Sequence, residues 1–144
     1  FVLRQKYLLK PAKPDNDAQA AAQALVMPLV DYIEETPEGI HYVKILSQLA
    51  ALNSAILNPS SNSRLTFQDD EKFGVLVRRA VSHLRTAEAQ RRIFLAVSIT
   101  FHGIADVCRA GDAPDTSRNL QNRAAMCDQV ALAVEALLAA PARN

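Results

Sequence analysis

The sequence has no tryptophan, only four glycines and two cysteines, and almost no net charge. With 16 basic and 15 acidic side chains, the formal net charge of +1 gives no general electrostatic basis for binding nucleic acid or a membrane surface. The shortage of glycine, together with many alanines and leucines, favours an all-α protein. The two cysteines, Cys108 and Cys127, lie in apolar stretches without CxxC spacing, which favours reduced thiols in a cytoplasmic protein over a disulfide scaffold.

Long hydrophobic runs are missing as well. The best apolar run, Ala24–Val30, is interrupted by Pro28 and is far shorter than the ~20 residues of a membrane-spanning helix. The first residues, Phe1–Arg4, do not have the layout of a signal peptide. We therefore expect no membrane partner. Because the first residue is not methionine, we interpret the chain as a fragment.

What is present is a composition suited to one helical domain. The 144 residues are 49% hydrophobic and 22% charged, which is typical of a single globular domain. Apolar residues recur at three- and four-residue steps along almost the whole chain, which predicts five or six helices. We expect residues 1–14 to form the tail of a connecting helix and a linker, and residues 15–144 to form the domain. The expected helices cover about 15–35, 37–57, 69–84, 86–110 and 117–140, with a loop at 58–63.

Several residues predict how these helices begin, bend and end. Pro28 predicts a kink or break in its helix. Thr36 is expected to cap the next helix, with Pro37 in its first turn. Thr86 is expected to cap the next long helix and Gly111 to terminate it. The expected apolar face of the helix over 15–35 contains Leu25, Leu29 and Ile33, and that of the helix over 37–57 contains Tyr42, Ile45, Leu46, Leu49 and Leu52. For the helix over 69–84 the expected apolar face is Phe73, Leu76, Val77, Ala80, Val81 and Leu84.

The last two predicted helices carry more apolar surface than a small domain covers by itself. Between Ile93 and Cys108 the apolar residues surround the helix, and the last helix has an apolar seam next to small alanines. A symmetric dimer joined by a four-helix bundle, with two helices from each subunit, would cover both. The expected dimer interface comprises Phe94, Val97, Ile104, Cys127, Val130, Val134 and Leu137.

Catalytic signatures are absent from the sequence. It has no nucleophile elbow, HExxH, P-loop or GxGxxG motif. Ser98, His102 and Asp106 share one helix face, but side chains that project in parallel do not converge on a substrate atom. Two of them could ligate a metal, although two ligands are too few and a structural hydrogen bond is the simpler role. We therefore expect no enzyme activity, no cofactor and no metal site.

Aromatic residues from several helices raise the question of an internal cavity. Ordinary core packing is the simpler interpretation for any one of them. The alternative is an apolar effector site with tyrosine or histidine as the polar anchor, favoured by space beside a kink at Pro28. Its expected lining is Leu29, Tyr32, Tyr42, Phe73, Phe101 and His102. The arginine pairs at 78–79 and 91–92 are interpreted as solvated surface charge.

The segments Ala24–Val30, Glu38–Leu46, Arg91–Phe94 and Phe101–Asp106 together resemble a known family. They are similar to the C-terminal, effector-binding and dimerisation domain of tetracycline-repressor-like (TetR family) transcriptional regulators of bacteria. The resemblance implies a homodimer that binds a hydrophobic small-molecule effector among its middle helices.

The resemblance also implies a change of DNA affinity when the effector binds. The N-terminal helix-turn-helix domain of such regulators is absent from this sequence, and Phe1–Leu9 resembles the helix that would follow it. We therefore expect DNA binding only through that missing domain. The alternative hypothesis is a helical protein–protein interaction or dimerisation module without a small-molecule ligand.

Overall fold

The computed structural model describes residues 7–8, 16–52, 71–113, 115 and 117–143. Within these residues the chain forms six helices and no strand, which confirms the all-α prediction. The helices are α2 (Asp17–Glu35), α3 (Gly39–Leu52), α4 (Glu71–Ala80), α5 (Thr86–Asp112), α6 (Arg118–Gln121) and α7 (Arg123–Ala139). Of the predicted helix tail and linker before Asn16, the structure describes only Tyr7 and Leu8, and both are helical. The predicted loop at 58–63 and the helix ends at 53–57 and 69–70 lie outside the described residues.

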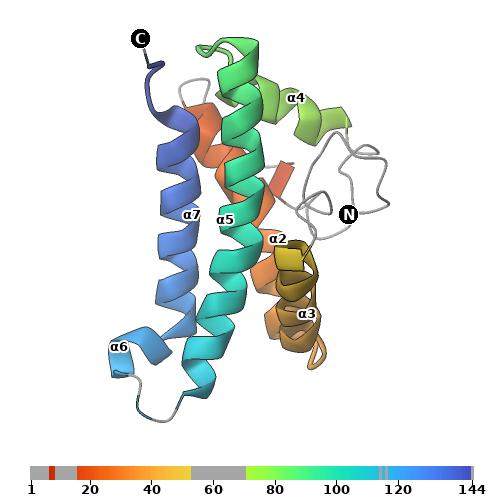
Figure 1. The fold of residues 1–144 in the computed structure, drawn as a ribbon, viewed down its shortest axis with the longest axis vertical. Coiled ribbons are helices and arrows are strands. Elements are labelled where there is room, and N and C mark those ends of the chain that lie inside the picture. The colour runs from red at the N-terminus through yellow and green to blue at the C-terminus, as the bar shows by residue number, and fades with distance from the viewer. Residues whose placement is uncertain (1–6, 9–15, 53–70, 114, 116, 144) are drawn as a thin grey trace.

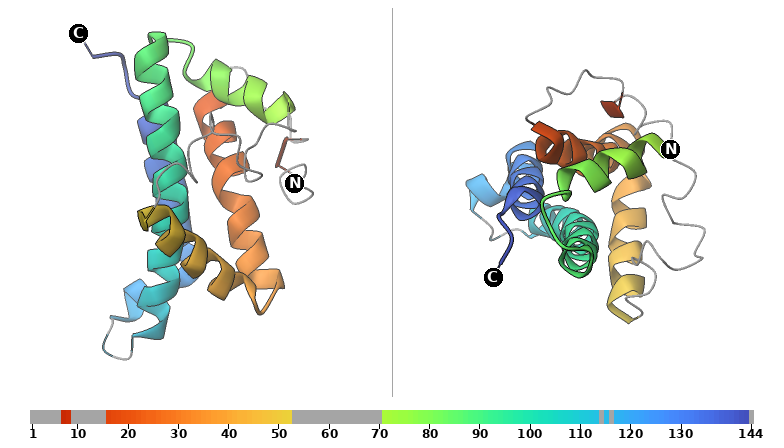
Figure 2. Two further views of the ribbon diagram at one scale, coloured as in Figure 1. Left: turned by 45° about the vertical axis from the view of Figure 1, so that its right-hand side comes forward. Right: turned by 90° about the horizontal axis from the view of Figure 1, so that it is seen from above.

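Three long helices form the centre of the fold. Helices α5 and α7 run antiparallel, side by side, and α2 packs against both (Figure 1). Helix α4 lies against the first half of α2, and α3 crosses α5 near the other end of the molecule (Figure 2). Most of the fully buried side chains come from the three central helices, among them Val26, Ile104 and Val134, and Val43 of α3 is buried as completely.

Helix α2 continues through Pro28 without a break. The predicted apolar residues Leu25 and Ile33 are buried, and Leu29 is partly buried against the same core. Alanines 21, 22 and 24 are also buried, and these small side chains let the backbone of α2 approach its neighbours closely. Packing along the helix therefore maintains it across the proline, so of the predicted kink or break, the break is wrong.

The turn between α2 and α3 differs from the predicted cap. Thr36 ends α2, with its backbone N–H donating to the Tyr32 carbonyl at 3.1 Å, and α3 begins only at Gly39. The Gly39 N–H donates to the Thr36 carbonyl at 2.9 Å. A β-carbon built on Gly39 would lie 2.5 Å from the Tyr32 carbonyl oxygen, so this turn requires glycine.

The face of α3 that packs on α5 is not the predicted one. Val43, Leu46, Ser47 and Ala50 are buried, and of these only Leu46 belonged to the predicted face. The other four predicted residues are exposed on the neighbouring face, namely Tyr42, Ile45, Leu49 and Leu52. Helix α3 carries two adjacent apolar stripes, and the helical period does not indicate which of them will be covered.

The remaining helix ends also differ from their predictions. Helix α4 ends at Ala80 rather than near Leu84, and Arg85 rather than Thr86 precedes the first residue of α5. Helix α5 passes through Gly111 to Asp112, so this glycine does not terminate it. The predicted last helix is divided at Asn122, whose side-chain oxygen accepts a hydrogen bond from the Ala125 N–H at 3.2 Å and caps α7.

Helix α5 is long and apolar enough to cross a membrane when judged by length and composition alone. No uninterrupted apolar run of the sequence indicates it. The central helix of a packed domain has the same properties, and α5 packs against α2, α3 and α7.

The C-terminal end of α7 is bound by a buried arginine of α5. The Arg92 guanidinium donates to the carbonyls of Leu137 at 3.2 Å and Pro141 at 2.7 Å, and also to the carbonyl of Ala140. It also pairs with Glu88 at 2.8 Å. The last carbonyls of a helix have no hydrogen-bond donor within the helix and carry partial negative charge. A guanidinium at this end supplies the missing donors and a compensating positive charge.

Candidate functional site

A pocket of about 260 Å³ lies between α4 and the three central helices. Its lining is apolar except for one arginine, and it consists of Ala21, Leu25, Phe73, Gly74, Val77, Arg78, Ile93, Ala96, Val97 and Leu138. An apolar concavity with one or two polar groups is the usual composition of a site for a small molecule. The pocket exists because α4 crosses α2 at one end of the molecule and leaves the space beside α5 and α7 unfilled.

Arg78 is the one charged residue in the pocket lining. Its guanidinium Nη1 lies 3.3 Å from the point where a β-carbon on Gly74 would be, one turn earlier in α4. The missing side chain at Gly74 therefore leaves room for the arginine to lie along the helix surface. Among the described residues no acidic side chain pairs with Arg78, whereas its neighbour Arg79 pairs with Asp17 of α2 at 2.6 Å.

Of the six residues predicted to bind a ligand, only Phe73 lines this pocket. Tyr32 and Tyr42 meet near the α2–α3 turn, with ring centroids 5.6 Å apart and planes at 87°. Partial burial, followed by the charge of Tyr32, raises the pKa of Tyr42. The predicted set is thus divided between two places in the fold.

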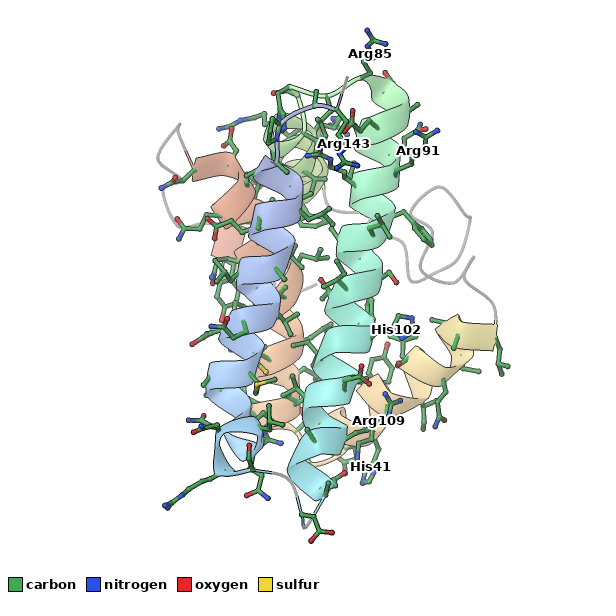
Figure 3. The ribbon with its side chains drawn as sticks, turned by 60° about the vertical axis from the view of Figure 1, so that its left-hand side comes forward. His41, Arg85, Arg91, His102, Arg109 and Arg143 are labelled. Carbon is green, nitrogen blue, oxygen red and sulfur yellow. The ribbon has the colours of Figure 1, made fainter. Side chains whose placement is uncertain are left out.

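The other three predicted residues also lie away from the pocket. Leu29 and Phe101 are half-buried at the edge of the core, and neither lines the pocket. His102 points from α5 toward α3, where its Nδ1 and the Ser47 hydroxyl are 2.8 Å apart (Figure 3). These three residues therefore do not share the described pocket with Phe73, because α3 and α4 contact the central helices at opposite ends.

The residues that do surround Phe73 were missed in the sequence for different reasons. The alanines and aliphatic residues of α2, α5 and α7 carry no signal beyond ordinary core periodicity. Arg78 is exposed, as its interpretation as a solvated charge predicts, and that interpretation does not indicate a pocket beside it. The four-residue spacing of Gly74 and Arg78 was the one available signal, since residues four apart are neighbours on a helix.

The serine, histidine and aspartate considered for catalysis do not act together. His102 interacts with Ser47 rather than Ser98, and the Asp106 carboxylate accepts from Arg109 at 2.8 Å. The Ser47 side chain is 3% exposed, so a substrate cannot reach its hydroxyl in this conformation. Among the described residues there is no group of three or more His, Cys, Asp or Glu side chains arranged to hold a metal ion.

Both cysteines are free and buried between α5 and α7. Burial raises the pKa of Cys108, and burial together with the charge of Cys108 raises that of Cys127 to about 11. A thiol that stays protonated and has no solvent access is a poor nucleophile at neutral pH. These cysteines therefore pack the core.

The residues predicted for the dimer interface divide into two groups. Four of them are buried inside a single chain, and a second copy has no access to their side chains: Val97, Ile104, Cys127 and Val134. The other three, Phe94, Val130 and Leu137, are only half-buried. Val130 packs against Gly103 of α5, where a β-carbon would lie 3.2 Å from its methyl groups.

The face of α7 that points away from the core carries small and apolar residues. Its exposed residues at helical spacing are Ala125, Gln129, Leu132, Ala136 and Ala139. Leu132 of α7 and Leu95 of α5 expose about half of their surface, at 54% and 46%. These exposed residues, rather than the buried seam, are what the last two helices present to another molecule.

The pocket lies at a basic end of the molecule. Arg85, Arg91 and Arg143 gather where α5 begins and the chain ends (Figure 3). Ile93 and Leu138, which line the pocket, belong to the same ends of α5 and α7. The acidic side chains of Asp17 and Glu88 are ion-paired with Arg79 and Arg92 and do not cancel the other positive charges.

Comparison of the chain with models of known protein families, with curated proteins and with solved structures found no match.

Proposed function

We propose that this chain is the ligand-sensing and dimerisation domain of a TetR-like transcriptional regulator whose DNA-binding domain precedes it. The observation that carries the proposal is the apolar pocket between α4 and the central helices. It is bordered by four helices, so a ligand bound there contacts α2, α4, α5 and α7 at once. A molecule that fills it changes the balance between arrangements of these helices.

The connection between α4 and α2 supplies a route for that change. Arg79 follows the pocket residue Arg78, and its guanidinium holds the Asp17 carboxylate with two hydrogen bonds of 2.6 and 3.3 Å. Asp17 is the first residue of α2, at the end where the N-terminal residues join the domain. A shift of α4 on ligand binding is therefore transmitted to the start of α2, to which a DNA-binding domain would be linked.

The outer face of α7 supports the dimerisation part of the proposal. Its alanines allow another helix to approach closely, and the exposed leucine at position 132 supplies apolar surface to bury. Two copies of α5 and α7 packed through this face form a four-helix bundle.

The ligand part of the proposal is tested by filling the pocket. Ala96 is buried and lines the pocket, so Ala96→Leu should occupy part of the 260 Å³. Ala87, exposed in the first turn of the same helix, provides the control Ala87→Leu. Hydrophobic compounds that raise the unfolding temperature of the wild-type chain should do the same for the control and lose their effect in Ala96→Leu. If every such compound stabilises all three chains equally, this pocket is not the ligand site.

The dimer is tested by light scattering on matched variants. Ala136→Glu places a charge on the exposed face of α7 and should convert a dimer into a folded monomer with unchanged helical circular dichroism. Val134→Asp places a charge in the interior and should unfold the subunit instead. A wild-type chain that remains monomeric at micromolar concentration contradicts the four-helix-bundle dimer.

The exposed apolar stripe of α3 favours a second candidate function, a helical interaction module. Ile45, Leu49 and Leu52 lie on one face and are 56%, 47% and 87% exposed. If this stripe rather than the pocket carries the function, Leu49→Asp should abolish self-association or partner binding. The pocket-filling variant should then have no effect on either.

A further inference from the structure

We infer that the pocket binds a compact apolar molecule carrying one carboxylate, and that Arg78 recognises this carboxylate. The inference rests on the proposed ligand-sensing function and specifies the chemical class of the ligand. It follows from the contrast between the apolar walls of the pocket and the single cation at its edge.

The side chains that form the walls of the pocket favour a ligand whose main part is apolar. Leu25, Phe73 and Ile93 supply large apolar surfaces from three helices, and Leu138 supplies a fourth from α7. None of these side chains forms hydrogen bonds, so a polar or sugar-like ligand would lose its hydrogen bonds to water on binding and gain none from the walls. The volume of about 260 Å³ corresponds to on the order of ten water-sized groups, which limits the ligand to a small molecule.

Arg78 selects the charge of the ligand. Its guanidinium has no acidic partner among the residues that the structure describes, so its donors are available to a ligand. A guanidinium presents two parallel N–H groups that match the two oxygens of a carboxylate. Arg78 is an exposed residue, so this attraction weakens as the salt concentration rises.

Two further features favour an anion over a cation or a neutral head group. Gly74 leaves the space that lets the Arg78 guanidinium lie beside the pocket, at 3.3 Å from the position of the missing β-carbon. Arg85, Arg91 and Arg143 stand at the same end of the molecule (Figure 3) and add positive potential. Asp17 and Glu88 are held in ion pairs with other arginines.

Octanoate and octanamide are suitable probes, because each has about ten non-hydrogen atoms and they differ only in the head group, which is charged in octanoate and neutral in octanamide. Calorimetric titration of the full chain should show octanoate binding at least about tenfold more tightly than octanamide, as a charge-assisted hydrogen bond requires. Rising salt should weaken the binding of octanoate and leave that of octanamide unchanged.

Three variants and one control separate the role of the charge from the role of the pocket. Arg78→Gln should reduce octanoate binding to the level of octanamide, while Arg118→Gln, a change at an exposed arginine of α6 at the other end of the molecule, should leave both unchanged. Gly74→Ala should weaken octanoate selectively, because the new methyl group displaces the guanidinium. Ala96→Leu should weaken both probes, because it fills the space that their chains share.

The outcomes distinguish failure of this inference from failure of the proposed function. Equal binding of both probes, unaffected by Arg78→Gln but lost in Ala96→Leu, overturns the carboxylate assignment and leaves the pocket as a ligand site. Octanoate binding that survives Ala96→Leu overturns the location of the site. If neither probe binds the wild-type chain, the assignment of a compact apolar acid is wrong, and the broader compound screen still decides the proposed function.

Discussion

Substitution of Gly39 by alanine should destabilise the domain, although alanine is the better helix former. Gly39 is the first residue of α3 and is buried against the end of α2. A β-carbon there would lie 2.5 Å from the Tyr32 carbonyl oxygen and 2.9 Å from the Ile33 Cα. Both are backbone atoms, so no side-chain rotation relieves the contact, and α3 must move away from α2.

The size of the effect follows from two opposing terms. Overpacking of this kind costs about 3 kcal/mol, at the upper end of the usual range because only backbone can yield. Replacing glycine by alanine in a helix contributes at most about 1 kcal/mol in the other direction. The net loss is about 2 kcal/mol, which for a domain of this size lowers the unfolding temperature by about 4–8 °C.

Gly111 supplies the matched control. It lies in the last turn of α5, has ordinary helical backbone and would place its β-carbon with no atom within 4 Å. Gly111→Ala should therefore stabilise the domain by about 0.5 kcal/mol. Gly103→Ala should fall between the two, because its β-carbon meets only the Val130 methyl groups at 3.2 Å.

Thermal and urea unfolding followed by circular dichroism at 222 nm measure the three variants against the wild-type chain. The expected order of stability, from highest to lowest, is Gly111→Ala, wild type, Gly103→Ala and Gly39→Ala. A Gly39→Ala chain as stable as Gly111→Ala would refute the close contact of the α2–α3 turn and, with it, the described position of α3.

Three further predictions concern buried groups of the central helices. Arg92→Met removes the donors that bind the end of α7 and should cost about 2 kcal/mol in urea unfolding, since hydrogen bonds from a charged group are lost, whereas Arg91→Met at an exposed position should cost nothing measurable. The thiols of Cys108 and Cys127 should react with a disulfide reagent only after unfolding, and a rapid reaction of the native chain would contradict their burial. Because folding raises the pKa of Cys127 from 9.0 to about 11, its contribution to stability is complete below about pH 9 and is lost as the pH rises to about 11. Cys127→Ala should flatten that decline in the free energy of unfolding.

The sequence by itself determined that this protein is helical and where most helices lie. Apolar residues at three- and four-residue steps reflect the turn of a helix, which is a local property of the chain. The same periodicity identified buried residues wherever a helix has one apolar face, as with Leu25 and Ile33 in α2 or Phe73 and Leu76 in α4. It did not do so in α3, where two apolar stripes compete.

Only the tertiary structure decided what each apolar surface contacts. Val134 and Cys127 belong to a seam that predicts a helix partner, but the partner is α2 and α5 of the same chain. In the same way, Arg92 resembles a solvated arginine in the sequence and is buried at the end of α7. The helical period specifies that a face must be covered and carries no information about which element covers it.

The pocket depends on the tertiary structure still more strongly. Its lining comes from four helices, and most of its residues are indistinguishable in the sequence from those of a filled core. An unfilled space arises from the crossing of α4 over the central helices, because crossing angles and distances set how closely side chains interdigitate. The sequence contains the residues of the site, but the space between them is a property of the packed helices alone.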